Sequence, residues 1–427
     1  MKLQIQSMFY GGSGLGRETT ASSDYATITV PFTLPGEIVE ATTIAASGHI
    51  ISAELVAIEQ PSPNRVEPRC PHFGACGGCQ YQHASYAAQT QIKQDILRDT
   101  LQAAGLTTLP EPQLHTAEPW GYRNRIRLRV ATVDGALHIG YNRRGSYEML
   151  PIHECPIAAP LLLRAAEAVL TIATTLPTWA RQLAEIELFT NSDQSRLQIT
   201  FFLRSDRSTD LAAFSKQLQT LVPELAGTGI TIVGASGRKE QPGASWGASG
   251  LKYQTAGREY WVSRGSFFQV NRFLVEELLQ LVTADRSGAL AWDLYAGVGL
   301  FSRPLAESFA EVVGVETVVG DLAAVLKGPG KRAVGATVAD FLRAAAVDRD
   351  RPQLIVMDPP RAGLGPEVCE LLSRIKAPQM VYISCDPVTL ARDLKAMVDS
   401  GYTVNELHLV DLFPQTFHME TVAILNR

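Results

Sequence analysis

The sequence contains little that would let it enter or cross a membrane. Its longest apolar runs, Leu161–Leu163 and Leu354–Met357, are far shorter than the roughly 20 residues that a transmembrane helix needs. The N-terminal residues Met1–Gln6 lack the continuous apolar core of a secretion signal. Membrane insertion and secretion are therefore excluded as first interpretations, and we expect a cytoplasmic protein.

Positive charge and cysteine are also scarce. The chain has 38 Lys and Arg against 43 Asp and Glu, so its net charge of −5 excludes a generally basic protein that coats nucleic acid. Six cysteines in 427 residues are too few for a disulfide scaffold. Hydrophobic residues make up 46%, which is typical of a folded chain, and the length predicts two to four domains. Nucleic-acid binding would therefore require basic residues that are concentrated locally.

The pattern along the chain indicates three regions. Residues 1–58 contain short β-rich segments for which a small β-barrel is the natural closure, with Gly11–Arg17 as a flexible loop. Residues 70–262 mix strands with helices and suggest an α+β domain. Residues 263–427 alternate strand and helix and end in two strands joined by a short turn. This rhythm predicts an α/β, Rossmann-like parallel sheet that ends in an antiparallel hairpin.

The first strand of the last region ends in a glycine-rich turn, Asp293–Gly299. Glycines there let a ligand approach the backbone and the free N–H groups of the next helix, although an ordinary tight turn has the same pattern. Glu316 closes the next strand, where a carboxylate can accept both hydroxyls of a ribose, and Asp340 follows the third strand, where it could hold an adenine amino group. An acidic residue after strand one and the final hairpin favour S-adenosylmethionine over NAD. The region resembles the class I methyltransferases.

Three reactive side chains follow neighbouring strands. Asp358 comes directly after the strand Leu354–Met357, Cys385 follows the strand Met380–Ser384, and Glu420 lies in the final hairpin. Because the carboxyl ends of parallel strands face one crevice, we expect Asp358 and Cys385 to share a site. Glu420 joins them only if the hairpin brings it in.

A thiol beside a methyl donor indicates methylation of a pyrimidine at C5. That carbon is a poor nucleophile until a thiolate adds to C6, and a base must afterwards remove the C5 proton. Cys385 fits the nucleophile, since it begins a helix whose N-terminus lowers the pKa of a thiol, and Glu420 fits the base. The alternatives are a small buried hydrophobic residue for Cys385 and an exposed strand residue for Glu420.

Five stretches resemble the RNA uracil-C5 methyltransferases, which make 5-methyluridine. They are GSFFQVN (Gly265–Asn271), DLYAGVGLFSRPLA (Asp293–Ala306), DPPRAGL (Asp358–Leu364), SCDPVTLARDL (Ser384–Leu394) and DLFPQTFHMETVAIL (Asp411–Leu425). The resemblance implies that Cys385 is the nucleophile and Glu420 the base. It also implies a pocket for S-adenosylmethionine and uracil, to which we assign Gln269, Tyr295, Leu300, Glu316, Asp340 and Asp358. The sequence departs from the family at Ala296, where cysteine is usual, and at Leu300, where a small polar residue is usual.

Four cysteines form a further candidate site. Cys70, Cys76 and Cys79 have the spacing C-x5-C-x2-C, and Cys155 lies far downstream. Four thiolates could bind zinc or an iron–sulfur cluster; the spacing favours neither strongly, and free cysteines are a third possibility. The segment Cys70–His83 resembles the [4Fe–4S] segment of many members of this family, and Cys155 matches its distant fourth ligand. The resemblance favours a [4Fe–4S] cluster with a structural role, since methyl transfer requires no electron.

Alternating arginines provide the local positive charge. In a strand, the four residues Arg123, Arg125, Arg127 and Arg129 would share one face and bind RNA phosphates. A solvated edge strand is the alternative. Gly11–Arg17 and Leu34–Ala41 resemble the TRAM domain, an RNA-binding barrel common in these enzymes, although this barrel is poor in Lys and Arg.

Together these features predict a monomeric enzyme that methylates C5 of one uridine in structured RNA. The two-domain N-terminal half with its cluster favours 23S rRNA, although archaeal enzymes for tRNA share that layout. An N-methyltransferase is less suitable, because those enzymes place an aromatic residue where Arg361 stands. A non-catalytic RNA-binding protein would have no need of Cys385, Glu420 and Asp358.

Overall fold

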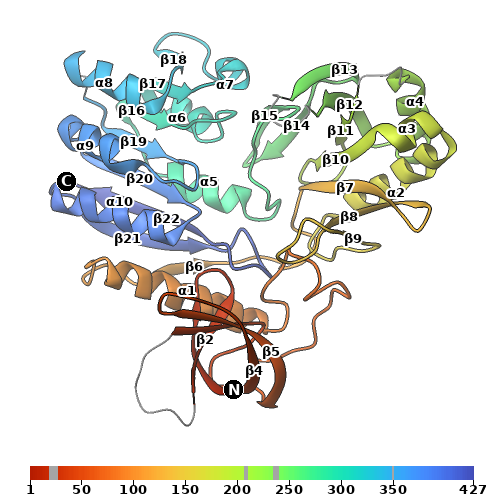
Figure 1. Cartoon of the computed structure of the whole chain (residues 1–427). Coiled ribbons are helices and arrows are strands. Elements are labelled where there is room, and N and C mark those ends of the chain that lie inside the picture. The colour runs from red at the N-terminus through yellow and green to blue at the C-terminus, as the bar shows by residue number, and fades with distance from the viewer. Residues whose placement is uncertain (19–26, 206–209, 234–239, 349–350) are drawn as a thin grey trace.

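Four β-sheets organise the chain, as the computed structural model in Figure 1 shows. The structure describes residues 1–18, 27–205, 210–233, 240–348 and 351–427. A small barrel lies at the N-terminal end, a seven-stranded sheet forms the central region, and an eight-stranded sheet with helices forms the C-terminal region. In the described residues, no helix is long and apolar enough to span a membrane.

The N-terminal strands close into a barrel in the order β1-β2-β3-β5-β4. They are β1 (Lys2–Phe9), β2 (Ser13–Glu18), β3 (Thr27–Pro31), β4 (Ile38–Ser47) and β5 (Ile50–Gln60). The prediction of a flexible loop at Gly11–Arg17 is wrong, because most of that segment belongs to β2. Gly14 faces the barrel interior, where a Cβ atom would lie 2.2 Å from Thr33 Oγ1. At this position glycine therefore permits close packing within a strand.

The central sheet carries its helices on one face. Its strands are β7 (Arg125–Val133), β8 (Ala136–Asn142), β9 (Met149–Pro151), β10 (Leu183–Thr190), β11 (Leu197–Leu203), β12 (Leu225–Ile232) and β13 (Gln241–Gly247). Its helices are α2 (Pro160–Thr175), α3 (Pro177–Gln182) and α4 (Leu211–Leu221). Ile126, Leu128 and Val130 of β7 pack against these helices. The alternation of β7 therefore sends its arginines to the opposite face of the sheet.

The C-terminal sheet has the predicted parallel strands followed by an antiparallel hairpin, in the order β18-β17-β16-β19-β20-β22-β21-β6. Its strands are β6 (Gln113–His115), β16 (Gly288–Leu294), β17 (Phe309–Glu316), β18 (Lys331–Gly335), β19 (Leu354–Met357), β20 (Gln379–Ser384), β21 (Thr403–Val410) and β22 (Glu420–Asn426). The helices around it are α1 (Tyr86–Ala103), α5 (Val275–Thr283), α6 (Ser302–Ser308), α7 (Gly320–Val325), α8 (Val338–Asp348), α9 (Gly365–Ile375) and α10 (Pro387–Asp399).

Both faces of this sheet are covered by helices. Ile355 and Met357 of β19 belong to the core under α1, α8, α9 and α10, whereas Leu354 and Val356 belong to the core under α5, α6 and α7. The second core also includes the hairpin β14 (Gly250–Thr255) and β15 (Arg258–Ser263). The result is a three-layer α/β/α domain.

The domain boundary differs from the expected one at residue 70. Helix α1 packs on the C-terminal sheet, with Ile96 and Leu97 buried in the same core as Met380. Strand β6 extends that sheet by pairing in parallel with β21. The chain thus completes part of the C-terminal domain before it enters the central one, as Figure 1 shows for the helix beneath the last hairpin.

A buried ion pair joins α1 to the segment between the last two strands. Lys93 Nζ lies 2.6 Å from Asp411 Oδ1 and donates a second hydrogen bond, of 3.0 Å, to the carbonyl oxygen of Phe413. Tyr86 Oη donates to the other oxygen of Asp411 at 3.0 Å. The side chains of Lys93 and Asp411 are both fully buried. Burial lowers the pKa of Lys93, and Asp411 opposes that effect.

Replacing Lys93 with Met should lower the free energy of unfolding by about 3–5 kcal/mol, because the Asp411 carboxylate would then be buried without its cation. Chemical denaturation of the purified variant measures the loss. Lys395→Met is the matched control: its partner Asp399 is exposed, so its cost should stay below about 1 kcal/mol. Equal losses in both variants would contradict this role for the pair.

Candidate active site

A cavity of about 820 Å3 opens at the carboxyl ends of the parallel strands. Segments after β16, β17, β18, β19 and β20 all contribute to its wall, as does the start of β22. The cavity brings together six of the eight predicted catalytic and cofactor residues: Gln269, Tyr295, Glu316, Asp358, Cys385 and Glu420. The final hairpin therefore places Glu420 beside the strand ends that carry Asp358 and Cys385.

Two buried carboxyl groups and a thiol dominate the electrostatics of this cavity. Burial, reinforced by the charge of Asp358, raises the pKa of Glu420 well above its usual range. Burial likewise raises the pKa of Asp358, and Asp293 adds to that effect. Gln269 Nε2 donates a hydrogen bond of 3.2 Å to Asp358 Oδ2. The site therefore favours protonated carboxyl groups until a positive charge is placed beside them.

The expectation that a helix N-terminus lowers the pKa of Cys385 is wrong. Burial, then the carboxylates of Glu420 and Asp358, raise this pKa to about 11. Cys385 precedes the cap of α10, and Asp386 Oδ1 takes the hydrogen bonds from the N–H groups of Val388 and Thr389. The helix terminus is thus satisfied by Asp386, and its positive end is not left for the thiol.

The glycine-rich turn after β16 faces the same cavity. Gly297 N donates to Glu316 Oε2 at 3.1 Å, and Thr317 N donates to Glu316 Oε1 at 2.6 Å. Gly297 has φ +54°, and a Cβ there would point into open space, where it would narrow the cavity. Tyr295 adopts a φ of +62°, which is strained for a residue with a side chain. The strained turn and the acidic strand end therefore lie next to each other in the wall of the cavity.

Leu300 and Asp340, which were assigned to the cofactor, lie outside the cavity lining. Leu300 is buried in the core beneath the sheet, and its carbonyl oxygen accepts a hydrogen bond from Tyr260. Asp340 Oδ2 accepts a hydrogen bond of 2.7 Å from Thr337 Oγ1, and its other oxygen lies 2.5 Å from Arg343. Thr337, three residues earlier in the same segment, does line the cavity.

The cavity is also lined by side chains that were not predicted to belong to the site. Arg361 Nη2 lies 2.6 Å from His418 Nδ1, and both residues line the wall near Cys385. Burial and the charge of Arg361 lower the pKa of His418 to about 4, so this imidazole is neutral at physiological pH. Phe267 lines the cavity although 65% of its surface is exposed. Each of them stands in a motif that also contains or adjoins a predicted residue: Arg361 in DPPR, His418 in HME and Phe267 in GSFF. Those positions were the available signal in the sequence.

The four clustered cysteines line a separate cavity of about 100 Å3. All four are free thiols, and burial raises the pKa of each, to about 12 for Cys79 and about 11 for Cys155. Within the described part of the chain, no group of three or more His, Cys, Asp or Glu is arranged as the ligands of one metal ion. The fold thus brings Cys155, which is distant in the sequence, to the segment that holds the other three cysteines.

The arginine row differs from the expected one. Strand β7 starts at Arg125, so Arg123 precedes it, and its backbone pairs with Ala158 and Asn271. Arg123 lines both the catalytic and the cysteine cavity, and its Nε is buried without a protein partner in the described residues. Arg125 donates to the carbonyl oxygen of Ser266. Only Arg127 and Arg129 present guanidinium groups on the outer part of this face.

Those two arginines already contact neighbouring protein groups. Arg127 Nε lies 2.5 Å from Glu185 Oε2, and its guanidinium stacks over the ring of Phe202. Arg129 Nη1 donates to Asn142 Oδ1 at 2.8 Å. An anion at this face would therefore have to compete with existing partners.

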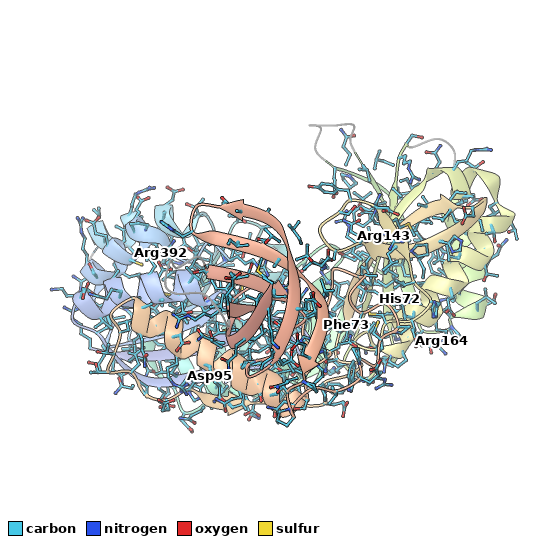
Figure 2. All side chains as sticks on the ribbon, turned by 60° about the horizontal axis from the view of Figure 1, so that its bottom comes forward. His72, Phe73, Asp95, Arg143, Arg164 and Arg392 are labelled. Carbon is cyan, nitrogen blue, oxygen red and sulfur yellow. The ribbon has the colours of Figure 1, made fainter. Side chains whose placement is uncertain are left out.

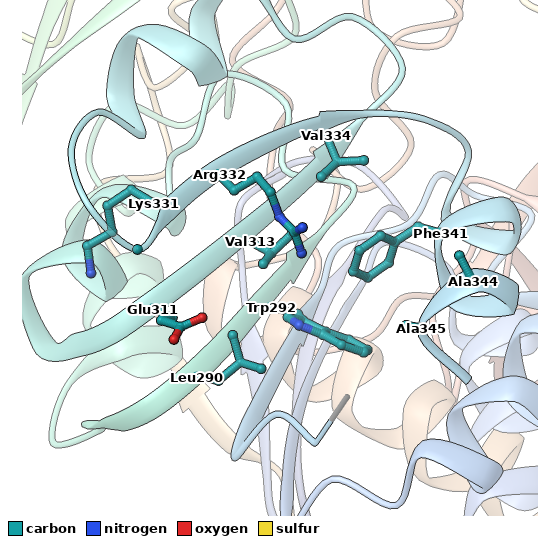
Figure 3. A pocket seen from close by; sticks show the side chains of 11 residues that line it. Leu290, Trp292, Glu311, Val313, Lys331, Arg332, Val334, Phe341, Ala344 and Ala345 are labelled. Carbon is teal, nitrogen blue, oxygen red and sulfur yellow. The ribbon is translucent and has the colours of Figure 1, made fainter. Parts of the chain in front are cut away.

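A further cavity, of about 690 Å3, lies on β16, β17 and β18 beside α8 (Figure 3). Trp292 and Phe341 meet edge to face on its floor, with ring centroids 4.9 Å apart, and Arg332 lies close by. Its lining contains none of the predicted catalytic or cofactor residues.

The fold and the cavity define a methyltransferase of the class I type that depends on S-adenosylmethionine. A model of the tRNA (uracil-5-)-methyltransferase family matches residues 85–427, so the chain belongs to this family. The protein is therefore an enzyme of the RNA uracil-C5 methyltransferases, as the sequence motifs predicted.

Individual relatives agree with this assignment. An uncharacterized RNA methyltransferase of Aquifex aeolicus is 30% identical over 448 residues, which cover 100% of this chain and 98% of the relative. One of Nitratidesulfovibrio vulgaris is 30% identical over 92% of this chain and 90% of its own. The Pyrococcus abyssi tRNA (uracil-54, C5)-methyltransferase, solved with S-adenosyl-L-homocysteine, has the same fold: the TM-score is 0.77 over 100% of both chains, at 22% identity.

Alkylation of the free enzyme tests the electrostatics of Cys385. Because only the thiolate reacts and the pKa is about 11, the rate with iodoacetamide should rise roughly tenfold per pH unit between pH 7 and 10. Glu420→Gln removes the negative charge that Glu420 acquires as the pH rises, so its rate in the upper part of this pH range should exceed that of the wild type. Mass spectrometry of the Cys385 peptide follows the reaction, and Glu406→Gln, on the exposed side of β21, is the control. A plateau near pH 8 in the wild type would contradict the raised pKa.

Proposed function

We propose that the protein methylates C5 of a uridine in structured RNA through a covalent bond between Cys385 and C6 of the uracil. The observation that carries this proposal is the shared cavity of Cys385, Glu420 and Asp358 at the carboxyl ends of the strands. Thiolate addition to C6 would make C5 nucleophilic enough to accept a methyl group, and loss of the C5 proton would release the thiol.

Glu420 is the proposed base. Its carboxyl group is almost fully buried, and its raised pKa increases its affinity for the proton that C5 must lose. The ionised carboxylate also lies close enough to Cys385 to raise the pKa of its thiol. Asp358, held by Gln269, contributes the second negative charge of the pair.

The residues of the glycine-rich turn fit S-adenosylmethionine, whose sulfonium supplies an electrophilic methyl group. Glu316 stands at the end of the second strand, where its carboxylate would accept the ribose hydroxyls. Gly297 keeps the wall beside it free of a side chain. Tyr295, Gln269 and Asp358 line the route from this half of the cavity to Cys385. The pKa values of the Asp358 and Glu420 carboxyl groups are raised, and a positive charge bound beside them would lower both.

The target base would have to leave its stack to reach a buried thiol, which favours a loop or a flipped uridine. The domain layout favours 23S rRNA, as inferred from the sequence. A uridine of tRNA is the second candidate, because the Pyrococcus abyssi enzyme for tRNA matches the fold over its full length. Arg127 and Arg129 are the proposed phosphate contacts on the outer face of β7, and the closed five-stranded barrel supports its assignment as a TRAM-like domain.

The four clustered cysteines would hold a [4Fe–4S] cluster. The four residues line one cavity from two segments that are distant in the chain, and Cys thiolates are the usual ligands of such a cluster. The group would stabilise the junction between the segment 70–79 and the loop at Cys155. No step of methyl transfer requires its electrons.

Two substitutions separate the proposed steps. Cys385→Ala should form neither a covalent RNA adduct nor 5-methyluridine, whereas Glu420→Gln should accumulate a methylated protein–RNA adduct, because the C5 proton cannot leave. The measurement uses tritiated methyl donor with 23S rRNA and tRNA purified from a strain that lacks the enzyme. Denaturing gels detect the adduct, and nucleoside mass spectrometry identifies the RNA and the product. Formation of 5-methyluridine by Cys385→Ala would refute the covalent mechanism.

Anaerobically purified protein should be brown and contain about four irons per chain if a [4Fe–4S] cluster is bound. Cys155→Ser should lose iron and folded yield, whereas Cys369→Ala should keep its iron, because Cys369 lies in the core under α9, away from the cysteine cavity. Colourless protein with stoichiometric zinc would contradict the proposal.

A further inference from the structure

The turn between β1 and β2 of the barrel reaches the loop that carries the nucleophile. Tyr10 Oη donates a long hydrogen bond of 3.4 Å to the backbone carbonyl oxygen of Cys385. The ring of Tyr10 packs edge-on against Phe417, with centroids 5.3 Å apart and planes at 84°. Phe417 in turn packs on the ring of His418 at 4.1 Å, and His418 lines the catalytic cavity. One barrel side chain thus contacts two segments of the active site.

The backbone of this turn is fitted closely to its surroundings. Gly12 has φ +93°, and a Cβ there would lie 2.7 Å from Cβ of Gln80 and 3.6 Å from Cβ of Phe417. Gln80 Oε1 accepts a hydrogen bond of 3.4 Å from the N–H of Phe417, and the N–H of Gln80 donates to the carbonyl oxygen of Gln415. The turn, Gln80 and the segment before β22 therefore form one packed unit.

The charge of the barrel makes it a poor binder of phosphate by itself. Residues 1–58 contain two basic residues, Lys2 and Arg17, against five acidic ones. Lys2 pairs with Glu59. Seen from its own side, the barrel covers the junction between the C-terminal domain and the region around His72 and Phe73 (Figure 2). The barrel is thus better placed to support the loops around the cavity than to bind RNA through positive charge.

We propose that Tyr10 is a positioning residue for the methyl-transfer reaction. It holds the main chain of Cys385 and, through Phe417, the segment that leads to Glu420. The inference rests on the proposed role of Cys385 as nucleophile. Holding the carbonyl oxygen of Cys385 fixes the backbone from which the thiol projects, and a reacting atom displaced by even a fraction of an ångström loses rate. Burial raises the pKa of Tyr10, so its hydroxyl remains a donor throughout the working pH range.

Tyr10→Phe removes the hydroxyl and keeps the ring, so it tests the hydrogen bond directly. The single-turnover rate of methylation at saturating enzyme, on 23S rRNA and tRNA from the deletion strain, should fall roughly fivefold. The Kd for the same RNA should stay within about twofold, because the barrel contributes little positive charge. Tyr147→Phe is the matched control, since Tyr147 is 92% exposed and loses the same atom.

Hydrogen exchange gives a readout that does not depend on the reaction. Amides of residues 384–390 should exchange faster in Tyr10→Phe than in the wild type or Tyr147→Phe, without RNA or cofactor present. Gly12→Ala, which keeps the hydroxyl but displaces the turn, should show the same two changes. Faster exchange without a slower rate would overturn the positioning role of Tyr10, whereas the role of Cys385 as nucleophile is tested separately by Cys385→Ala. Wild-type exchange and rate in Tyr10→Phe, or a loss confined to RNA affinity, would overturn the proposal.

Discussion

The buried ion pair between Lys93 and Asp411 is the constraint on which the catalytic cavity depends. Asp411 begins the segment between β21 and β22, and Lys93 holds it from a helix more than 300 residues earlier in the chain. That segment carries His418 and leads directly into Glu420, so the position of the proposed base follows from an interaction made by α1. Removal of either ion would leave the other buried without a partner, so the contact between α1 and this segment is costly to break.

The active site is therefore assembled from all parts of the chain. Parallel strands supply Asp358 and Cys385, the hairpin supplies Glu420, and Arg123 lines the cavity from the segment before β7. The barrel contacts the loop of Cys385 through Tyr10. Arg123 lies between this cavity and that of the four cysteines, so its guanidinium is the shared wall of both. The three regions of the sequence act as one structural unit around the thiol.

The sequence alone was sufficient for the C-terminal sheet, because alternating strands and helices have few possible arrangements and place strand-end residues at one edge. It was insufficient where contacts are distant in the chain, as for β6 beside β21 or Tyr10 beside Cys385. Motif spacing also misplaced Leu300 and Asp340, since it does not say which way a side chain points. The raised pKa of Cys385 depends on burial and on carboxylates from two other strands, which spacing does not reveal.

The raised pKa of Cys385, which lies before the Asp386 cap, bears on how fast the enzyme is oxidised. A thiol with a pKa near 11 is almost entirely protonated in the cell, and protonated thiols react slowly with peroxides and disulfides. The proposed nucleophile would therefore react slowly with oxidants as long as its thiol stays protonated. A positive charge bound in the cavity would offset the charges of Glu420 and Asp358 and so lower the pKa of the thiol. The molecules bound in the site would thus control when the reactive thiolate forms.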